Sequence, residues 1–172
     1  MDRKITIGLF GTCGNSTWRN RFMAEYNKRE IEYFNPQKED WSPLDAENEA
    51  DHLANDEIIL FPVTHETYAF GSLGEVGFSI MQAIKLNTHR DIVVMIDPSV
   101  KVDHSGMSIA EYMVVETQTK DSIKMRALIT AHLKRVKYPN VYIVDSLENM
   151  LKLSLQLHAL QVLREGLKKY TI

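Results

Sequence analysis

The stretch that decides the fold is residues 57–63, EIILFPV, an almost unbroken apolar run. Four further runs have the same character, the last of them more weakly: 4–10, 91–96, 141–144 and 31–34. Near-continuous apolar strands are typical of parallel strands that are covered on both faces. The sequence therefore predicts a parallel five-stranded sheet inside an α/β three-layer sandwich.

Helical patterns separate these runs and complete a Rossmann-like or flavodoxin-like order. Asn15 or Ser16 is expected to cap a helix whose apolar face repeats every four residues, at Trp18, Phe22 and Tyr26. Ser42-Pro43 and Ser146-Leu147 have the capping hydroxyls that begin two more helices. A further helix after the central strand has its core face at Leu73, Val76, Ile80, Ala83 and Ile84. Residues 100–119 are expected to form a loop and a short helix around 109–113.

The composition fits a single domain over residues 1–172 and an intracellular setting. One cysteine in 172 residues excludes an internal disulfide framework, and no apolar run approaches the ~20 residues that span a bilayer. A cytoplasmic protein is therefore expected, with no membrane partner. Residues 118–172 are basic, but their charges alternate with apolar residues at helical spacing, so a solvated helix face is predicted and no nucleic acid polymer.

In an open parallel sheet, ligands bind outside the carboxyl ends of the strands, so the loops that follow each strand are the candidates. The first, residues 11–16, leads into a helix N-terminus, where backbone N–H groups attract anions and sugar hydroxyls. It lacks the third glycine of the dinucleotide fingerprint and the lysine of the Walker motif. Gly11 and Thr12 are therefore candidate binding residues, with a plain tight turn as the alternative. Cys13 is interpreted as a small buried thiol.

The second loop contains Asn35-Pro36 and then Asp40-Trp41. A tryptophan beside an aspartate is suited to cover a planar base. The alternative is a structural role, in which Trp41 packs against the helix that Ser42 caps. Both interpretations stay open at this point.

Glu75 is the strongest candidate in the sequence for a catalytic residue. Ser72-Leu73-Gly74-Glu75 has the pattern of a capping box, which predicts a helix that begins there. Two features favour a chemical role: glycines at 71, 74 and 77 would let a ligand approach closely, and a carboxylate in the first helical turn is kept ionised by the helix dipole. Both roles can coexist, with Ser72 as the cap and Glu75 facing a ligand.

His65 and Glu66 follow the central strand directly, but the second histidine of a zinc-protease motif is missing, because position 69 is Ala69. The other histidines show no ligand spacing. Neither a metal site nor a cofactor is predicted.

Taken in order, five segments of the first half of the chain resemble the nucleoside 2-deoxyribosyltransferase superfamily. These segments are Gly11-Thr12 with Trp18, Phe34-Asn35-Pro36, Asp40-Trp41, 55–61 and 71–77. The resemblance implies a small-molecule nucleoside or nucleotide substrate bound by Gly11, Thr12, Asn35, Pro36, Asp40, Trp41, Gly71 and Ser72.

The resemblance also implies a double displacement. Glu75 matches the family's glutamate, which attacks the anomeric carbon of a 2-deoxyriboside and forms a covalent glycosyl-enzyme. Asp56 matches the aspartate that protonates the departing base. A second base, or water, then releases the sugar. The family's usual second carboxylate is replaced by Ala69-Phe70. Either Glu66 substitutes for it, or Ser72 makes a different contact, as serine does in members that take 5′-monophosphates.

By the same analogy, a homo-oligomer is expected. The alternative is a non-catalytic nucleotide-binding or sensor module on the same scaffold, which the Ala69-Phe70 departure keeps open.

Overall fold

The sheet is all-parallel and has five strands in the order β2-β1-β3-β4-β5. The computed structural model describes residues 4–40, 42–86, 90–135 and 137–170, and for 82–86 the backbone only. The strands are β1 (Thr6–Leu9), β2 (Glu32–Phe34), β3 (Ile58–Val63), β4 (Asp91–Ile96) and β5 (Val141–Ile143). The predicted α/β class and parallel five-stranded sheet are confirmed.

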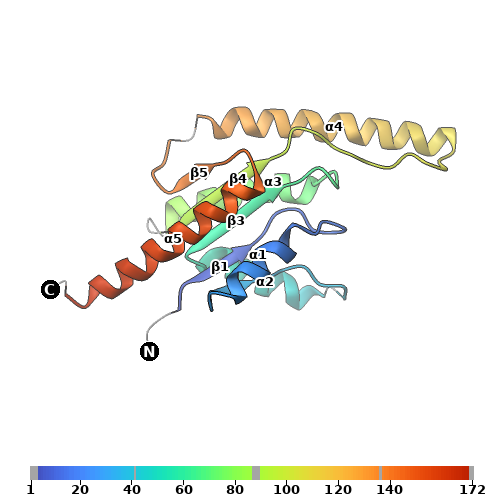
Figure 1. Ribbon diagram of the computed structural model, residues 1–172. Helices are drawn as coiled ribbons and strands as arrows, with labels where there is room; N and C mark the ends of the chain where they lie inside the picture. The colour runs from blue at the N-terminus through green and yellow to red at the C-terminus, as the bar shows by residue number, and fades with distance from the viewer. Residues whose placement is uncertain (1–3, 41, 87–89, 136, 171–172) are drawn as a thin grey trace.

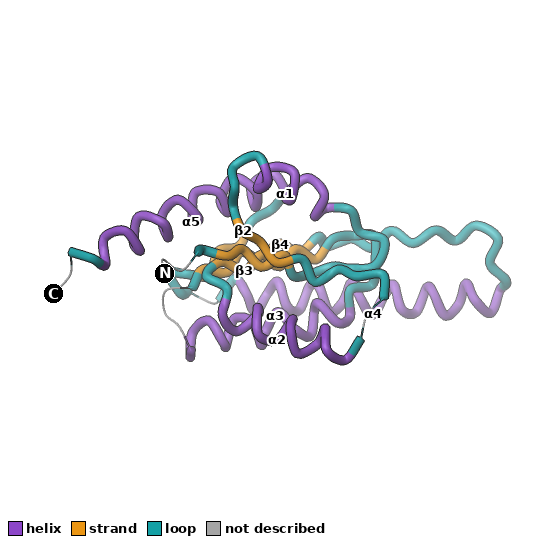
Figure 2. Tube along the Cα trace, turned by 90° about the horizontal axis from the view of Figure 1, so that it is seen from below, coloured by secondary structure: helices purple, strands orange, loops and turns teal. Residues whose placement is uncertain are grey.

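Helices cover both faces of this sheet. Figure 2 shows α1 and α5 on one face, and α2, α3 and α4 on the other. The helices are α1 (Trp18–Asn27), α2 (Pro43–Asn55), α3 (Phe70–Leu86), α4 (Ile109–Leu133) and α5 (Leu147–Lys168). One apolar core lies beneath α1 and α5, and a second lies beneath α3 and α4. The three-layer sandwich is therefore present, with β3 and β4 buried at its centre.

The helix starts follow local chemistry. Asp45 accepts hydrogen bonds from the Ser42 amide (2.9 Å) and hydroxyl (2.6 Å), as the predicted cap of α2 requires. Ser146 accepts from the Asn149 amide at the start of α5. For α1 the predicted cap is wrong by one or two residues: Thr17 holds that position and makes no side-chain capping bond. Of the expected core face of α3, Ala83 and Ile84 lie outside the described side chains.

The long helix α4 replaces the loop and short helix expected within residues 100–119. It runs for 25 residues and begins with a capping box, in which Ser108 and Glu111 exchange hydrogen bonds. Its first half is almost entirely exposed, so it has no apolar stripe from which its length could be predicted. Figures 1 and 2 both show this half extending past the ends of the strands.

The strand order places a topological switch point between β1 and β3, because the chain leaves β1 for β2 on one side and returns to β3 on the other. Ligands of such sheets bind at the carboxyl edge next to this point. The loops that follow β1, β2 and β3 meet there. No helix in the described part of the chain has the length and apolarity needed to cross a membrane.

Candidate functional site

The loop after β1 is held in place by buried polar contacts. Gly11 has a φ of +86°, and a Cβ atom there would stand 2.3 Å from the Pro62 carbonyl oxygen, so the position requires glycine. Thr12 is buried, and its hydroxyl accepts a hydrogen bond from the Thr64 amide at 3.0 Å. Gly11 and Thr12 therefore fasten the loop to β3, and the part of the loop open to a ligand begins at Cys13.

Arg19 of α1 lies fully buried beneath this loop. Its guanidinium donates to the carbonyl oxygens of Leu9 (2.8 Å), Thr12 (2.6 Å) and Phe10 (3.2 Å). A buried charge is stable only when it is well hydrogen-bonded, and the loop carbonyls supply that solvation. No motif in the sequence singles out Arg19, since it is a basic residue beside the apolar face of a helix.

A cleft with a volume of ≈ 800 Å³ opens beside this loop at the carboxyl edge. It lies between the loops that follow β1 and β2, and α1 and α2 complete its walls. The Gln37 side chain bridges the two loops by donating to the Gly14 carbonyl oxygen at 2.7 Å. The cleft is lined by Cys13, Gly14, Asn15, Ser16, Thr17, Asn20, Met23, Asn35, Pro36, Gln37, Lys38, Glu39 and Glu49.

Two of the predicted binding residues, Asn35 and Pro36, line this cleft. The Asn35 side-chain oxygen accepts from the Gln37 amide at 3.0 Å, which shapes the loop. Asp40 is exposed and is absent from the lining, and Trp41 lies outside the described residues. Cys13, predicted to be buried, is exposed at the cleft. Of the predicted binding residues, this cleft therefore brings together Asn35 and Pro36.

Glu75 lies in the second turn of α3, which begins at Phe70 and not at Ser72. Ala69, with a φ of +55°, already accepts the first helical hydrogen bond, from the Leu73 amide at 2.8 Å. The predicted capping box at 72–75 is therefore wrong. Gly71 is exposed and Ser72 is buried in the first turn, and neither belongs to the cleft lining.

Two features of its surroundings act on the pKa of Glu75. Desolvation, followed by the negative charge of Glu49, raises the pKa of Glu75 above its ordinary value. Glu75 does not lie in the first turn, where the sequence placed it. Glu49 lines the cleft from α2, whereas Glu75, on the neighbouring helix α3, is absent from the lining.

The Cys13 thiol, which lines the cleft, responds to the charges of Glu49 and Glu75. The pKa of this thiol is raised by desolvation first, and the charges of Glu49 and Glu75 raise it further, against the nearby Arg19 guanidinium. A carboxylate affects a thiol in this way only at short range. The charges of Glu49 and Glu75 therefore both act on the Cys13 thiol.

The glycines of α3 serve two different sides of the helix. Nothing lies within 4 Å of a Cβ atom built on Gly71, which is one turn before Glu75 on the same side. Gly74 and Gly77 instead line a small apolar groove between α3 and α4, together with Leu73 and Ile129. A Cβ atom built on Gly74 or Gly77 also meets nothing within 4 Å, so none of the three glycines is required by a close neighbour among the described residues.

Asp56 lies at the opposite edge of the sheet. It is 5% exposed, precedes β3, and its backbone carbonyl oxygen accepts from Arg90 Nε at 2.6 Å, just before β4 begins. Glu75 is eleven residues before the end of α3 at Leu86, about 16 Å along the helix axis. The structure does not bring the predicted acid and nucleophile together.

Asp56 has its own partner instead. One carboxylate oxygen lies 2.9 Å from His52 Nδ1, and the other has no hydrogen-bond partner among the described residues. Burial raises the pKa of Asp56, and the His52 contact opposes that shift. These contacts join the end of α2 to the amino edge of the sheet.

Buried hydrogen bonds from α4 hold the loops after β3 and β4. Arg126 of α4 is fully buried and donates to the carbonyl oxygens of Asp97 (2.7 Å), Thr67 (2.8 Å) and Thr64 (2.9 Å). His65 Nδ1 lies 3.0 Å from a carboxylate oxygen of Asp97 on the same edge. Within the described residues, no group of three or more His, Cys, Asp or Glu side chains is placed to hold a metal ion.

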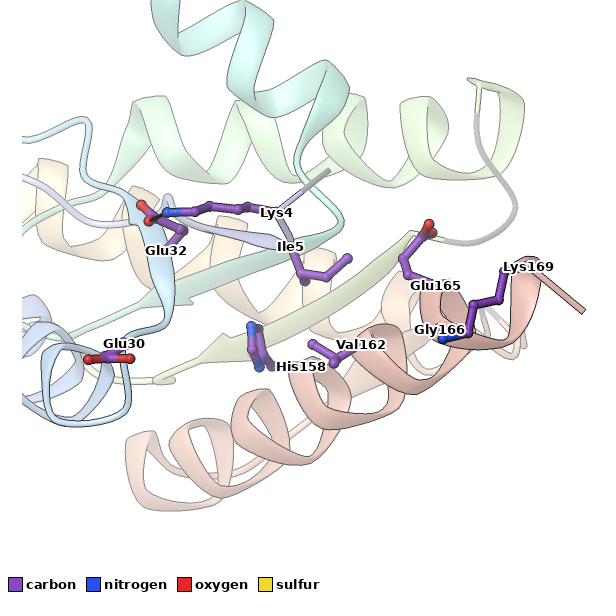
Figure 3. A pocket seen from close by; sticks show the side chains of 9 residues that line it. All are labelled: Lys4, Ile5, Glu30, Glu32, His158, Val162, Glu165, Gly166 and Lys169. Atoms are coloured by element: carbon purple, nitrogen blue, oxygen red, sulfur yellow. Dashed lines mark hydrogen bonds and ion pairs between the residues drawn. The ribbon is translucent and has the colours of Figure 1, made fainter. Parts of the chain in front are cut away.

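A second cavity, of ≈ 450 Å³, lies at the amino edge between the start of β1 and the end of α5 (Figure 3). Its lining is a mixture of acids and bases: Lys4 pairs with Glu32, and His158, Glu165 and Lys169 come from α5. Parallel sheets bind ligands at the other edge. The carboxyl-edge cleft is therefore the candidate functional site.

No protein-family model matches this chain, and no curated protein matches it. The fold and the cleft thus define the protein only as a doubly wound α/β protein with a carboxylate-lined cleft beside its switch point.

Proposed function

We propose that the protein is an enzyme that cleaves or exchanges the N-glycosidic bond of a 2′-deoxynucleoside or deoxynucleotide, with Glu75 as the nucleophile. The observation that carries this proposal is the cleft of ≈ 800 Å³ at the switch point, which is lined by Glu49 and Cys13. Glu75 is not part of the lining, but the charge of Glu49 raises its pKa, and α2 packs against α3. Such a cleft falls in the size range of small-molecule sites. The resemblance noted in the sequence supplies the reaction class.

In the first half-reaction, a Glu75 carboxylate oxygen bonds to the anomeric carbon while the bond to the base nitrogen breaks. The base leaves with a proton, and the sugar remains as an ester of Glu75. In the second half-reaction, water or another base bonds to the same carbon and releases the carboxylate. Retaining glycosidases use two neighbouring carboxyl groups for these steps.

Glu49 is the better candidate for the second carboxyl group. It lines the cleft and its charge raises the pKa of Glu75, whereas Asp56 lies at the far edge of the sheet. In this proposal Glu75 attacks the sugar and Glu49 positions the departing base from the cleft wall. The proton that the base gains comes from water in the open cleft.

A second copy of this chain is proposed to cover the exposed face of α3. Phe78 and Met81 are 64% and 60% exposed there, and one turn away Gly74 and Gly77 open an apolar groove. Projecting side chains and a groove on the same helix are self-complementary, as a two-fold interface requires. The cytoplasm is proposed as the location, from the single cysteine.

The test is turnover of a panel of 2′-deoxynucleosides and their 5′-monophosphates, each with and without an acceptor base, followed by chromatography of the released base. We expect wild-type protein to release or exchange the base, and Glu75→Gln to lose at least about a thousandfold in rate. Glu47→Gln, an exposed carboxylate of α2 outside the cleft lining, is the control and keeps its activity. Equal inertness of wild-type and Glu75→Gln proteins, both folded, would contradict the proposal.

A further inference from the structure

The cleft is markedly acidic. Glu39 and Glu49 belong to its lining, and Glu75 lies beside it. Among the described residues, Lys38 is the one lysine or arginine in the lining, and it forms an ion pair with Asp45 of α2. Residues 39–84, which supply α2, β3 and most of α3, contain ten Asp or Glu residues and no Lys or Arg. Lys38 is therefore the one cation in the described lining, and Asp45 already pairs with it.

Two positive features lie near the cleft, and neither balances this charge. Arg19 is fully buried, and its guanidinium is engaged by the carbonyl oxygens of the loop after β1 and by the Cys13 sulfur. The N-terminus of α1, at Thr17 and Trp18, contributes about half an elementary charge. This partial positive charge is smaller than the negative charge of the two carboxylates in the lining, Glu39 and Glu49.

We propose that the cleft selects the uncharged nucleoside and rejects its 5′-phosphate, with Glu39 as a specificity-determining residue. A phosphate monoester carries a charge of about −1.5 to −2 at neutral pH. Carboxylates that line a concave, low-dielectric site repel such a group, because the walls focus the field. This inference rests on the proposed function only in placing the substrate in this cleft.

The measurement is an equilibrium titration of each natural 2′-deoxynucleoside and of its own 5′-monophosphate, at low and at high salt. Glu75→Gln protein is used so that no ligand is consumed. We expect the nucleoside to bind about tenfold more tightly than its monophosphate. Added salt should strengthen monophosphate binding, because screening weakens repulsion, and should leave nucleoside binding unchanged.

A charge reversal at position 39 tests whether Glu39 causes the discrimination against the 5′-phosphate. Glu39→Lys, added to the same protein, should raise monophosphate affinity several-fold and leave nucleoside affinity within about twofold. Glu47→Lys makes the same charge change at an exposed site of α2 outside the cleft lining, and should change the ratio much less.

Monophosphate binding that equals or exceeds nucleoside binding, or that weakens with salt, overturns the inference even if the wild-type enzyme turns over both. Preferential nucleoside binding without any turnover supports the inference and contradicts the proposed chemistry. Binding of neither ligand, together with no turnover, overturns both.

Discussion

The negative charge of Glu49 on α2 acts on Glu75 of α3 as a second influence after desolvation. The pKa of Glu75 is raised by desolvation and then by Glu49. A raised pKa means that the ionised, nucleophilic form is lost at a higher pH as the solution is acidified. Activity should therefore fall on the acidic side at a higher pH than an isolated glutamate would give.

Glu49→Gln removes one of these two causes. We expect the pKa of Glu75 to move down toward its ordinary value, so that the carboxylate stays ionised to a lower pH. A carbon-detected NMR titration of the Glu75 carboxyl group measures this without requiring turnover. Glu47→Gln is the matched control on the same helix and should leave the titration unchanged. An unchanged or higher pKa of Glu75 in Glu49→Gln would show that the two carboxylates do not interact.

The places of single residues in the fold could be predicted only where the order of strands and loops along the chain decides them. Asn35 and Pro36 line the cleft because they directly follow β2, and any residue after a parallel strand lies at the carboxyl edge. Asp56 precedes β3, so the same rule puts it at the amino edge, although the family resemblance had favoured a catalytic role. Glu49 could not be found from sequence, because its nearness to Glu75 depends on the packing of α2 against α3.

At the level of whole elements, α4 is attached to the carboxyl edge of the sheet by two buried polar side chains, Arg126 and Ser122, and the Ser122 hydroxyl donates to the Tyr68 carbonyl oxygen at 2.7 Å. Arg126 donates to the carbonyl oxygens of Asp97, Thr64 and Thr67, and its Nε donates to Ser122 Oγ at 3.1 Å. These bonds satisfy backbone groups of the loops after both β3 and β4. Arg126 therefore joins two central strand ends to the helix that covers them.

Arg126→Met keeps much of the side-chain volume and removes every one of the guanidinium donors. We expect the free energy of unfolding to fall by about 3 kcal/mol or more, because several buried carbonyl groups lose their partners. Chemical denaturation monitored by circular dichroism measures the change. Arg135→Met, at an exposed position just after α4, is the control and should cost less than about 0.5 kcal/mol. Equal stabilities of the two variants would contradict the assigned role.

The elements themselves were predictable to different degrees, for a physical reason. Strands β3 and β4 are buried on both faces, so their apolar runs mark them almost to the residue. The first half of α4 packs against little, and its sequence has no apolar period to read. The start of α3 was misplaced because Ala69 adopts a left-handed conformation before Phe70, which no capping pattern announces.

For the molecule as a whole, the exposed apolar face of α3 indicates self-association. Phe78 on α3 and Leu163 on α5 are equally exposed, at 64%, but only Phe78 lies beside the groove at Gly74 and Gly77. Isolated apolar residues at a surface are ordinary, whereas a projecting side chain next to an apolar groove is typical of an interface.

We therefore expect Phe78→Lys to shift the protein from dimer or higher oligomer to monomer, and Leu163→Lys to leave its mass in solution unchanged. Light scattering coupled to size-exclusion chromatography measures both. A wild-type protein that is monomeric at high concentration, or a Phe78→Lys protein of unaltered mass, would rule out this face of α3 as the contact between copies.

The covalent glycosyl-enzyme is the intermediate that separates this mechanism from direct attack by water. Wild-type protein is incubated with a 2′-deoxynucleoside without acceptor base, quenched in acid, digested and analysed by mass spectrometry. We predict a mass increase of one 2-deoxyribosyl group on the peptide that contains Glu75, and none in Glu75→Gln. Base release with no such adduct, or an adduct on another residue, would contradict the assignment of Glu75 as the nucleophile.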